Sequence, residues 1–231
     1  MLVYKESGIT MNQFINKIKE LYPTHKIAYA GRLDPMARGI VPILIDDECK
    51  NMDMYTSKDK IYHVKIIIGI QTDSDDALGI IQNTNYDFDI HQVVETCNDI
   101  LASSNNKTIN QRFHYFSTKE INKRRKNKEN VQSYHIVKLY NSSILSVGIL
   151  NKDEWVEEIN RLISSIDNTK EFRQKEIINQ WKSMKNIDKI QYIELELNVS
   201  SGFFVRQYIR DLSHHINIPL MCFDIHRVSC S

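Results

Sequence analysis

The sequence is poor in residues that would form cross-links or structural metal sites. Its 231 residues include four cysteines, at positions 49, 97, 222 and 230. They form no CxxC pair and lack the spacing of a zinc site. We therefore expect reduced thiols in a cytosol-like compartment and no metal.

Excess charge of one sign is also missing. Thirty basic residues face 29 acidic residues, and the formal charge is +1. No global field attracts polyanions, so any affinity for nucleic acid must come from a local patch.

Long apolar segments are absent too. No run is long enough to span a bilayer, and the N-terminus, MLVYKESGIT, has no signal-peptide core. The composition, 42% hydrophobic and 26% charged, is that of a globular domain. A chain of this length can bury one sizeable core, or one domain with a substantial insertion. We expect a cytoplasmic protein with no membrane partner.

One carboxylate lies in an unusual local setting, within the stretch 26–45, KIAYAGRLDPMARGIVPILI. Pro35 fixes the backbone directly after Asp34 and disfavours helical geometry there, which predicts a rigid loop. The apolar run 40–45 then predicts a buried strand. A rigid carboxylate beside apolar sequence suggests nucleophilic or acid/base chemistry. The alternative is an ordinary turn aspartate before proline.

Hydrophobic periodicity predicts alternating strands and helices, without fixing their topology. A capping box predicts that Thr10 and Gln13 begin a helix that Pro23 ends. Asp89 is expected to cap a second helix, and Asp153 a third. The predicted strands are residues 2–4, 40–45, 60–71, one or two within 131–145, 190–199 and 221–228. The predicted helices are residues 10–21, 89–101, two within 152–189 and 203–216.

Clustered acids at 72–79, TDSDDALG, raise the possibility of a metal site. Their spacing fails the EF-hand pattern, which needs a central glycine and a distal glutamate. We favour a turn in which aspartate side chains accept hydrogen bonds from backbone N–H groups. The acids also lack the paired arrangement of a metal-dependent nuclease.

Aromatic and basic residues occur together after residue 111. Rings beside a basic run are typical of surfaces that bind looped or single-stranded RNA. A solvated basic loop and a localisation signal are the alternatives. The residues are Phe113, Tyr115, Phe116, Lys119, Lys123, Arg124, Arg125, Lys126 and Lys128.

The segment GRLDPMARG resembles the catalytic motif G-x-LDP-x-A-x-G of the TruB family of tRNA pseudouridine synthases. The matching positions are Gly31, Leu33, Asp34, Pro35, Ala37 and Gly39. This resemblance implies that Asp34 is the nucleophile. The family's K-x-Y strand and TDTxDxxG turn are similar to residues 60–62 and 72–79, which implies that Tyr62 stacks on the target base. Its S-(S/K)-G-x-Y-I-R motif resembles residues 200–206, which implies that Arg206 pairs with Asp34.

Other segments match less closely. Glu6 replaces the proline of the family's K-P-x-G turn, both prolines after Gln111 are missing, and Tyr29-Ala30 replaces a His-Thr pair. Residues 221–228 are similar to the closing strand. The implied substrate-binding residues are Tyr29, Arg32, Lys60, Gln111, Phe116, Lys119, Lys123, Arg124, Arg125, Arg210, Ile225 and Arg227.

The resemblance implies an α+β pseudouridine synthase fold, with a central mixed, mostly antiparallel sheet, flanking helices and an RNA-binding cleft. Residues 1–231 then form one catalytic domain without a PUA domain. Residues 150–189 are interpreted as a helical insertion, which either touches RNA or decorates the domain. The implied activity is conversion of a T-loop uridine of tRNA, position 55 by convention, by a monomer without cofactor. The alternatives are an RNA-binding or RNA-folding module with weak or no catalysis, and the same chemistry on another RNA.

Overall fold

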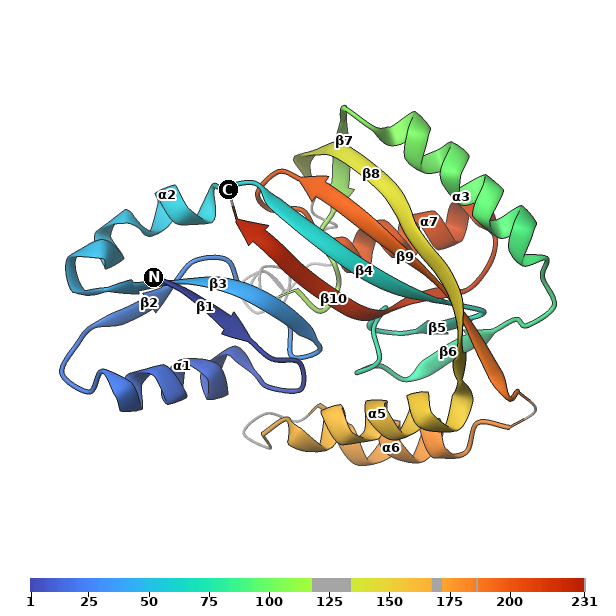
Figure 1. Ribbon diagram of the computed structural model, residues 1–231, viewed down its shortest axis with the longest axis horizontal. Helices are drawn as coiled ribbons and strands as arrows, with labels where there is room; N and C mark the ends of the chain where they lie inside the picture. The colour runs from blue at the N-terminus through green and yellow to red at the C-terminus, as the bar shows by residue number, and fades with distance from the viewer. Residues whose placement is uncertain (118–133, 168–171, 186, 231) are drawn as a thin grey trace, which may run out of the picture.

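A mixed eight-stranded sheet forms the centre of the molecule (Figure 1). The computed structural model describes residues 1–117, 134–167, 172–185 and 187–230. β10 runs parallel to β3, and the other strand pairs of the sheet are antiparallel. In spatial order the strands are β1 (Leu2–Lys5), β3 (Ala37–Ile45), β10 (Leu220–Cys230), β4 (Lys60–Ile68), β9 (Lys189–Val199), β8 (Tyr134–Asn151) and β7 (Lys107–Arg112), with β2 (Ile27–Tyr29) paired to β3.

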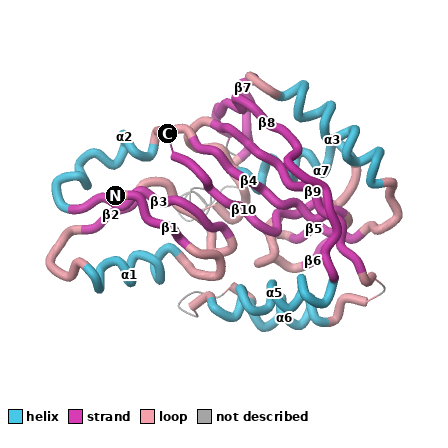
Figure 2. The backbone as a smooth tube through the Cα atoms, viewed as in Figure 1, coloured by secondary structure: helices cyan, strands magenta, loops and turns pink. Residues whose placement is uncertain are grey.

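The helices flank this sheet, which gives the predicted α+β class with a mostly antiparallel sheet (Figure 2). In the view of Figure 1, α7 lies behind the sheet and α5 and α6 run together along its lower edge. The helices are α1 (Met11–Leu21), α2 (Met52–Thr56), α3 (Ile90–Ser104), α5 (Lys152–Ser165), α6 (Gln174–Lys182) and α7 (Val205–Ile216), with a short 3-10 helix, η1 (Asp46–Asn51). Within the described residues, none of these helices has both the length and the apolar character needed to cross a bilayer.

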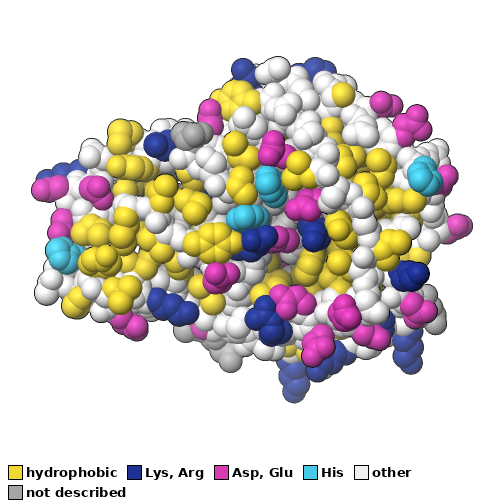
Figure 3. Space-filling view, viewed as in Figure 1, with side chains coloured by type: hydrophobic (Ala, Val, Ile, Leu, Met, Phe, Trp, Pro, Cys, Tyr) yellow, Lys and Arg dark blue, Asp and Glu magenta, His cyan; other side chains and the backbone are white. Residues whose placement is uncertain are grey.

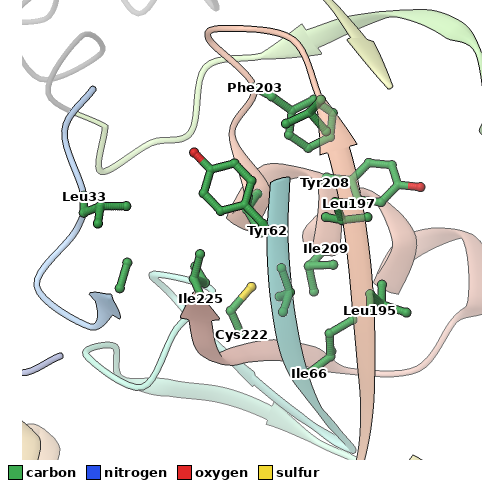
Figure 4. Packing of buried hydrophobic residues seen from close by; sticks show 14 of the residues in the cluster. Leu33, Tyr62, Ile66, Leu195, Leu197, Phe203, Tyr208, Ile209, Cys222 and Ile225 are labelled. Atoms are coloured by element: carbon green, nitrogen blue, oxygen red, sulfur yellow. The ribbon is translucent and has the colours of Figure 1, made fainter. Parts of the chain in front are cut away.

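Strand β4 shows how the sequence pattern produces the core. Tyr62, Val64 and Ile66 are buried on the side of α7, as the alternation predicts. Figure 4 shows Tyr62 above Ile66 and Cys222, with its hydroxyl pointing away from them and its ring between Leu33 and Phe203. The ring of Tyr62 therefore lies at the edge of the hydrophobic core.

The opposite face of the sheet carries paired polar side chains, which gather near the centre of the view in Figure 3. On this face of the sheet, His63 Nε2 lies 3.1 Å from Glu196, and Arg38 pairs with Asp224 at 2.6 Å. Tyr62 points to the opposite side of the sheet, so the predicted cleft lies on the face that Figure 3 does not show.

Three predicted boundaries were wrong. The strand expected within 131–145 is β8, which continues to Asn151. The strand expected over 60–71 ends at Ile68, because Gly69 adopts φ +87 and turns the chain into a two-stranded hairpin of β5 (Ile70–Thr72) and β6 (Ile81–Thr84). Helix α5 is capped by Asn151, whose Oδ1 accepts from the N–H of Asp153 at 2.9 Å, so Asp153 lies inside the helix.

Other predictions were confirmed. Thr10 and Gln13 form the capping box at α1, and Asp89 caps α3. The apolar run 40–45 lies within β3. The stretch 152–189 holds α5 and α6, while its interpretation as an insertion remains a prediction.

Candidate active site

The loop that carries Asp34 is held by its backbone carbonyls. Fully buried Lys5 donates from Nζ to three of them, those of Asp34, Pro35 and Ala37, at 3.2, 3.3 and 2.7 Å. The N–H of Gly8 also donates to the carbonyl of Pro35, at 2.9 Å. Lys5 and the turn before α1 therefore fix the backbone from Asp34 to Ala37, a role for Lys5 that the sequence pattern did not indicate.

Asp34 is paired with Arg206 on α7. Arg206 Nη2 lies 2.7 Å from Asp34 Oδ2, and the two side chains are 8% and 39% exposed. Arg206 Nη1 donates to the carbonyl of Ser74 at 2.9 Å and lies 3.2 Å from the buried carboxylate of Asp76. The guanidinium is thus fixed from behind, and the accessible edge of Asp34 points to solvent.

This pairing decides the protonation of Asp34. Burial alone raises the pKa of a carboxyl group, but the Arg206 charge and hydrogen bond outweigh burial and hold the pKa of Asp34 below its usual value. Burial likewise opposes the charge of Arg206, while Asp34 and Asp76 raise its pKa above the ordinary arginine value. The site therefore holds an ionised, partly accessible carboxylate near neutral pH, which is the form a nucleophile needs.

The acidic turn 72–79 supplies Asp76, the second carboxylate that contacts Arg206. As predicted, its side chains accept from backbone N–H groups: Asp73 Oδ1 from Ile80 at 2.9 Å, and Asp76 Oδ1 from Leu78 at 3.0 Å. Most of the turn is buried rather than solvated, and its Asp76 carboxylate contacts Arg206. It therefore anchors the guanidinium, and no group of three His, Cys, Asp or Glu residues within the described parts of the chain could hold a metal ion.

A buried histidine lies next to this pair and was missed by the sequence analysis. His114 Nε2 lies 2.8 Å from Asp75 Oδ2, and both side chains are 0% exposed. Burial, Arg206 and Arg210 lower the pKa of His114 to about 2, so the ring is neutral. Its Nδ1 accepts from the N–H of Phe116, which leaves the proton on Nε2 to donate to Asp75. Burial raises the pKa of Asp75 to about 6, although Arg210 opposes this.

The only sequence signal for His114 was the loss of the family's prolines after Gln111. The two residues in their place are Phe113 and His114. Arg210 Nε lies 2.7 Å from Asp75 Oδ2, so the network reaches α7 one turn beyond Arg206. Arg210, predicted to bind substrate, therefore points into the protein network.

A cavity of about 250 Å³ opens above Asp34. It joins the catalytic loop, β4, β10 and the start of α7, and the Tyr62 ring forms part of its wall. Exposed Arg32 lies at its rim. The lining residues are Gly31, Arg32, Leu33, Asp34, Ala37, Thr56, Lys60, Tyr62, Ser117, Ser200, Ser201, Gly202, Phe203, Phe204, Val205, Arg206, Ile225 and Arg227. A larger hollow of about 530 Å³ between α5 and α6 includes none of the predicted site residues in its lining.

Three predicted substrate-binding residues are buried and already hold protein groups. Gln111 accepts from the N–H of Phe204 at 2.8 Å and donates to its carbonyl at 2.9 Å. Arg227 donates to the carbonyls of Ile40 and Gly31 at 2.7 and 2.8 Å. Lys60 donates to the carbonyls of Thr56, at 2.7 Å, and Lys58. Arg227 and Lys60 still line the cavity, whereas Gln111 orients the start of α7.

The remaining predicted residues are dispersed. Ile225 is buried in the cavity wall, Tyr29 lies on β2 outside the cavity lining, and Phe116 lies beneath the Arg173 guanidinium, 5.8 Å from ring centre to charge. Four basic residues lie outside the described residues: Lys119, Lys123, Arg124 and Arg125. Their part in substrate binding stays a prediction.

The chain is similar in sequence to members of one known protein family. Residues 19–155 match the family model described as TruB family pseudouridylate synthase (N terminal domain). The tRNA pseudouridine synthase B of Mycoplasmoides gallisepticum is 26% identical over 228 residues, covering 98% of this chain and 88% of that relative. The tRNA pseudouridine synthase B of Blochmanniella pennsylvanica is 23% identical over 229 residues, covering 99% and 73%.

A solved Cbf5-Nop10-Gar1 complex contains a chain of similar fold. The TM-score is 0.58 at 12% identity, and the match covers 99% of this chain and 48% of that chain. At this identity the likeness concerns the fold alone.

Proposed function

Because this chain belongs to the TruB family of pseudouridylate synthases, we propose that it converts a T-loop uridine of tRNA, position 55 by convention, to pseudouridine. The observation that carries the proposal is the ionised Asp34, paired with Arg206 at 2.7 Å beneath a cavity bordered by Tyr62. A protein that only bound RNA would have no need of a carboxylate kept charged and accessible at the end of a cavity.

The reaction breaks the C1′–N1 glycosidic bond of the uridine, turns the base and rejoins it through C5, whose proton is released to solvent. The uridine must first leave its stack, at a cost of about a few kcal/mol. Tyr62 then supports the flipped ring, because its ring ends the core and borders the cavity. The apolar wall at Ile225 and Leu33 keeps the ring in the cavity.

Asp34 acts as the nucleophile in this proposal. Its pKa is held low by Arg206, so the carboxylate is ready to attack without a separate base. Arg206 is itself held by Asp76 and Ser74, so it keeps its place while charge on Asp34 changes during the reaction. The chemistry calls for no metal, nucleotide or redox group.

RNA is held mainly at the rim of the cavity. Exposed Arg32 contacts a phosphate near the flipped base, and the basic residues 119–128 contact the T-arm backbone. Since the net charge of the chain is +1, these local contacts carry the electrostatic attraction. Binding to a T-arm hairpin should therefore weaken steeply with added salt, and a flat salt response would argue against the basic segment.

The first experiment measures tritium release from C5-labelled uridine in a tRNA T-arm hairpin, with wild type and Asp34→Asn. The proposal expects release by wild type and none by the variant, with hairpin binding similar in both. No release from wild type, with binding intact, would favour another RNA or a non-catalytic RNA-folding module. Full-length tRNA and total RNA as substrates then separate these two alternatives.

We also propose that the protein works as a cytoplasmic monomer. All four cysteines are free, as expected of a reducing compartment. The Asp34 site is built from elements of one chain, so no second copy is needed to complete it. Sedimentation equilibrium at micromolar protein would test this, and a stable dimer would contradict it.

A further inference from the structure

Helices α5 and α6 form a hairpin that shares a second hydrophobic core with the catalytic parts of the chain. Met36, which follows Asp34-Pro35, is 3% exposed within this core. Trp155 and Trp181 meet edge to face there, with ring centroids 5.3 Å apart. The other buried members are Ile67, Ile70, Ala77, Leu78, Val156, Ile159, Leu162, Ile163, Ile166, Ile177, Ile190 and Met221. The hairpin is therefore packed directly beneath the Asp34 loop and the acidic turn.

The C-terminal end of α5 contacts the turn at Gly8, and this turn in turn contacts the Asp34 loop. Ser165 Oγ donates to the carbonyl of Gly8 at 2.8 Å, and Gln13 Nε2 donates to the carbonyl of Ser165 at 3.0 Å. Gly8 adopts φ +78, and a Cβ at this position would lie 2.4 Å from Ser165 Oγ. The N–H of the same Gly8 donates to Pro35. One residue therefore separates the hairpin from the backbone of the nucleophile's loop.

Helix α6 holds the acidic turn that contacts Arg206. Arg173, at its N-terminus, binds both oxygens of Asp73, at 2.7 and 3.2 Å. Trp181 Nε1 donates to the carbonyl of Ala77 at 3.1 Å. The backbone carbonyls of Asp73 and Ser74 in turn accept from Arg210, at 3.1 Å, and Arg206, at 2.9 Å. The turn is thus fixed between α6 and α7.

We infer that the α5–α6 hairpin is a brace that sets the geometry of the Asp34–Arg206 pair, with Ser165 and Arg173 as positioning residues. The inference rests on the proposed function, since it assigns the brace to the same catalytic pair. Asp34 and Arg206 come from distant parts of the sequence and share no rigid element. A shift of about 1 Å between such groups can cost on the order of a hundredfold in rate, so a common support beneath both has a direct catalytic effect.

Charge argues against RNA binding along helix α5. Acidic residues outnumber basic ones in α5, and its first turn carries Asp153 and Glu154. The guanidinium of Arg173 is already engaged by Asp73. A phosphate backbone would meet repulsion over α5 rather than an open basic surface.

The test compares Arg173→Gln and Ser165→Ala with a matched control, Lys175→Gln. Lys175 is exposed on the same helix as the Arg173 cap and carries the same charge. Single-turnover tritium release at saturating T-arm hairpin should fall roughly tenfold in Arg173→Gln and further in the double variant, with dissociation constants unchanged. Arg173→Lys should recover part of the rate, and Lys175→Gln should match wild type.

Two further readouts separate positioning from general stability. A displaced Arg206 lets the pKa of Asp34 rise, so the acidic limb of the rate profile should move to higher pH in Arg173→Gln. Amide hydrogen exchange should quicken in peptides covering 31–39 and 72–79, whether or not the substrate has been identified correctly.

The outcomes are distinct. An active wild type with Arg173→Gln at full rate and unchanged exchange would overturn the brace and leave the proposed function intact. Equal loss of RNA affinity in Arg173→Gln and Lys175→Gln would also overturn it, in favour of an RNA-contacting hairpin. If wild type released no tritium, the proposed function would fail, and the exchange data alone would still decide whether the hairpin supports the two loops.

Discussion

Replacing Arg206 tests the centre of the proposed site. Arg206→Ala removes the partner of Asp34 and also leaves the buried carboxylate of Asp76 without its counter-charge. Two unit charges about 4 Å apart interact by about 4 kcal/mol at an effective dielectric constant near 20. Asp34 is 39% exposed, so solvent screening reduces this to roughly 2–3 kcal/mol, which corresponds to about 30- to 150-fold in rate.

The assay is single-turnover tritium release at saturating T-arm hairpin, with hairpin affinity measured separately by filter binding. We expect a rate loss on the order of a hundredfold and little change in affinity, because Arg206 lies beneath the cavity. Arg206→Lys should recover only part of the loss, since one ammonium cannot reproduce the separate contacts to Asp34, Asp76 and Ser74. A rate within threefold of wild type for Arg206→Ala would refute the assigned pairing.

Three other perturbations follow from the same contacts. Because Arg206 lowers the pKa of Asp34, protonation of this carboxylate should reduce the wild-type rate only below the ordinary carboxyl range of about pH 4; a decline already between pH 7 and pH 6 would contradict this. Lys5→Met should cost about 1–3 kcal/mol in urea unfolding, because it leaves the carbonyls of the Asp34 loop without their donor, and should slow turnover. His114 is neutral when folded but titrates near 6.5 when unfolded, so acid lowers stability; between pH 7 and pH 5 wild type should lose about 2 kcal/mol more than His114→Gln, measured by urea unfolding at both pH values.

Local elements were predictable because their causes are local. The capping box of α1 needs only Thr10 and Gln13, and the buried face of β4 follows from alternation along one strand. The family was identified from motif spacing around Asp34, and the match over 19–155 confirms it. The break at Gly69 was not visible in the pattern, because apolar residues continue on both sides of it.

The contacts between distant elements were not predictable. Ser165 reaches Gly8, and Arg173 reaches Asp73, only because the α5–α6 hairpin folds back under the sheet. Periodicity located both helices but contains no information about where their inner faces pack. The role left open for residues 150–189 therefore depended on tertiary contacts alone.

The acidic turn illustrates the same limit at single-residue scale. Its sequence, TDSDDALG, is equally compatible with a solvated turn, yet each carboxylate has a different partner: Asp73 binds Arg173, Asp75 binds His114, and Asp76 faces Arg206. Asp75 adopts φ +57, a left-handed conformation that aspartate tolerates better than most residues. The environment of the nucleophile therefore depends on a turn about 41 positions along the chain, whose carboxylates contact Arg173, His114 and Arg206.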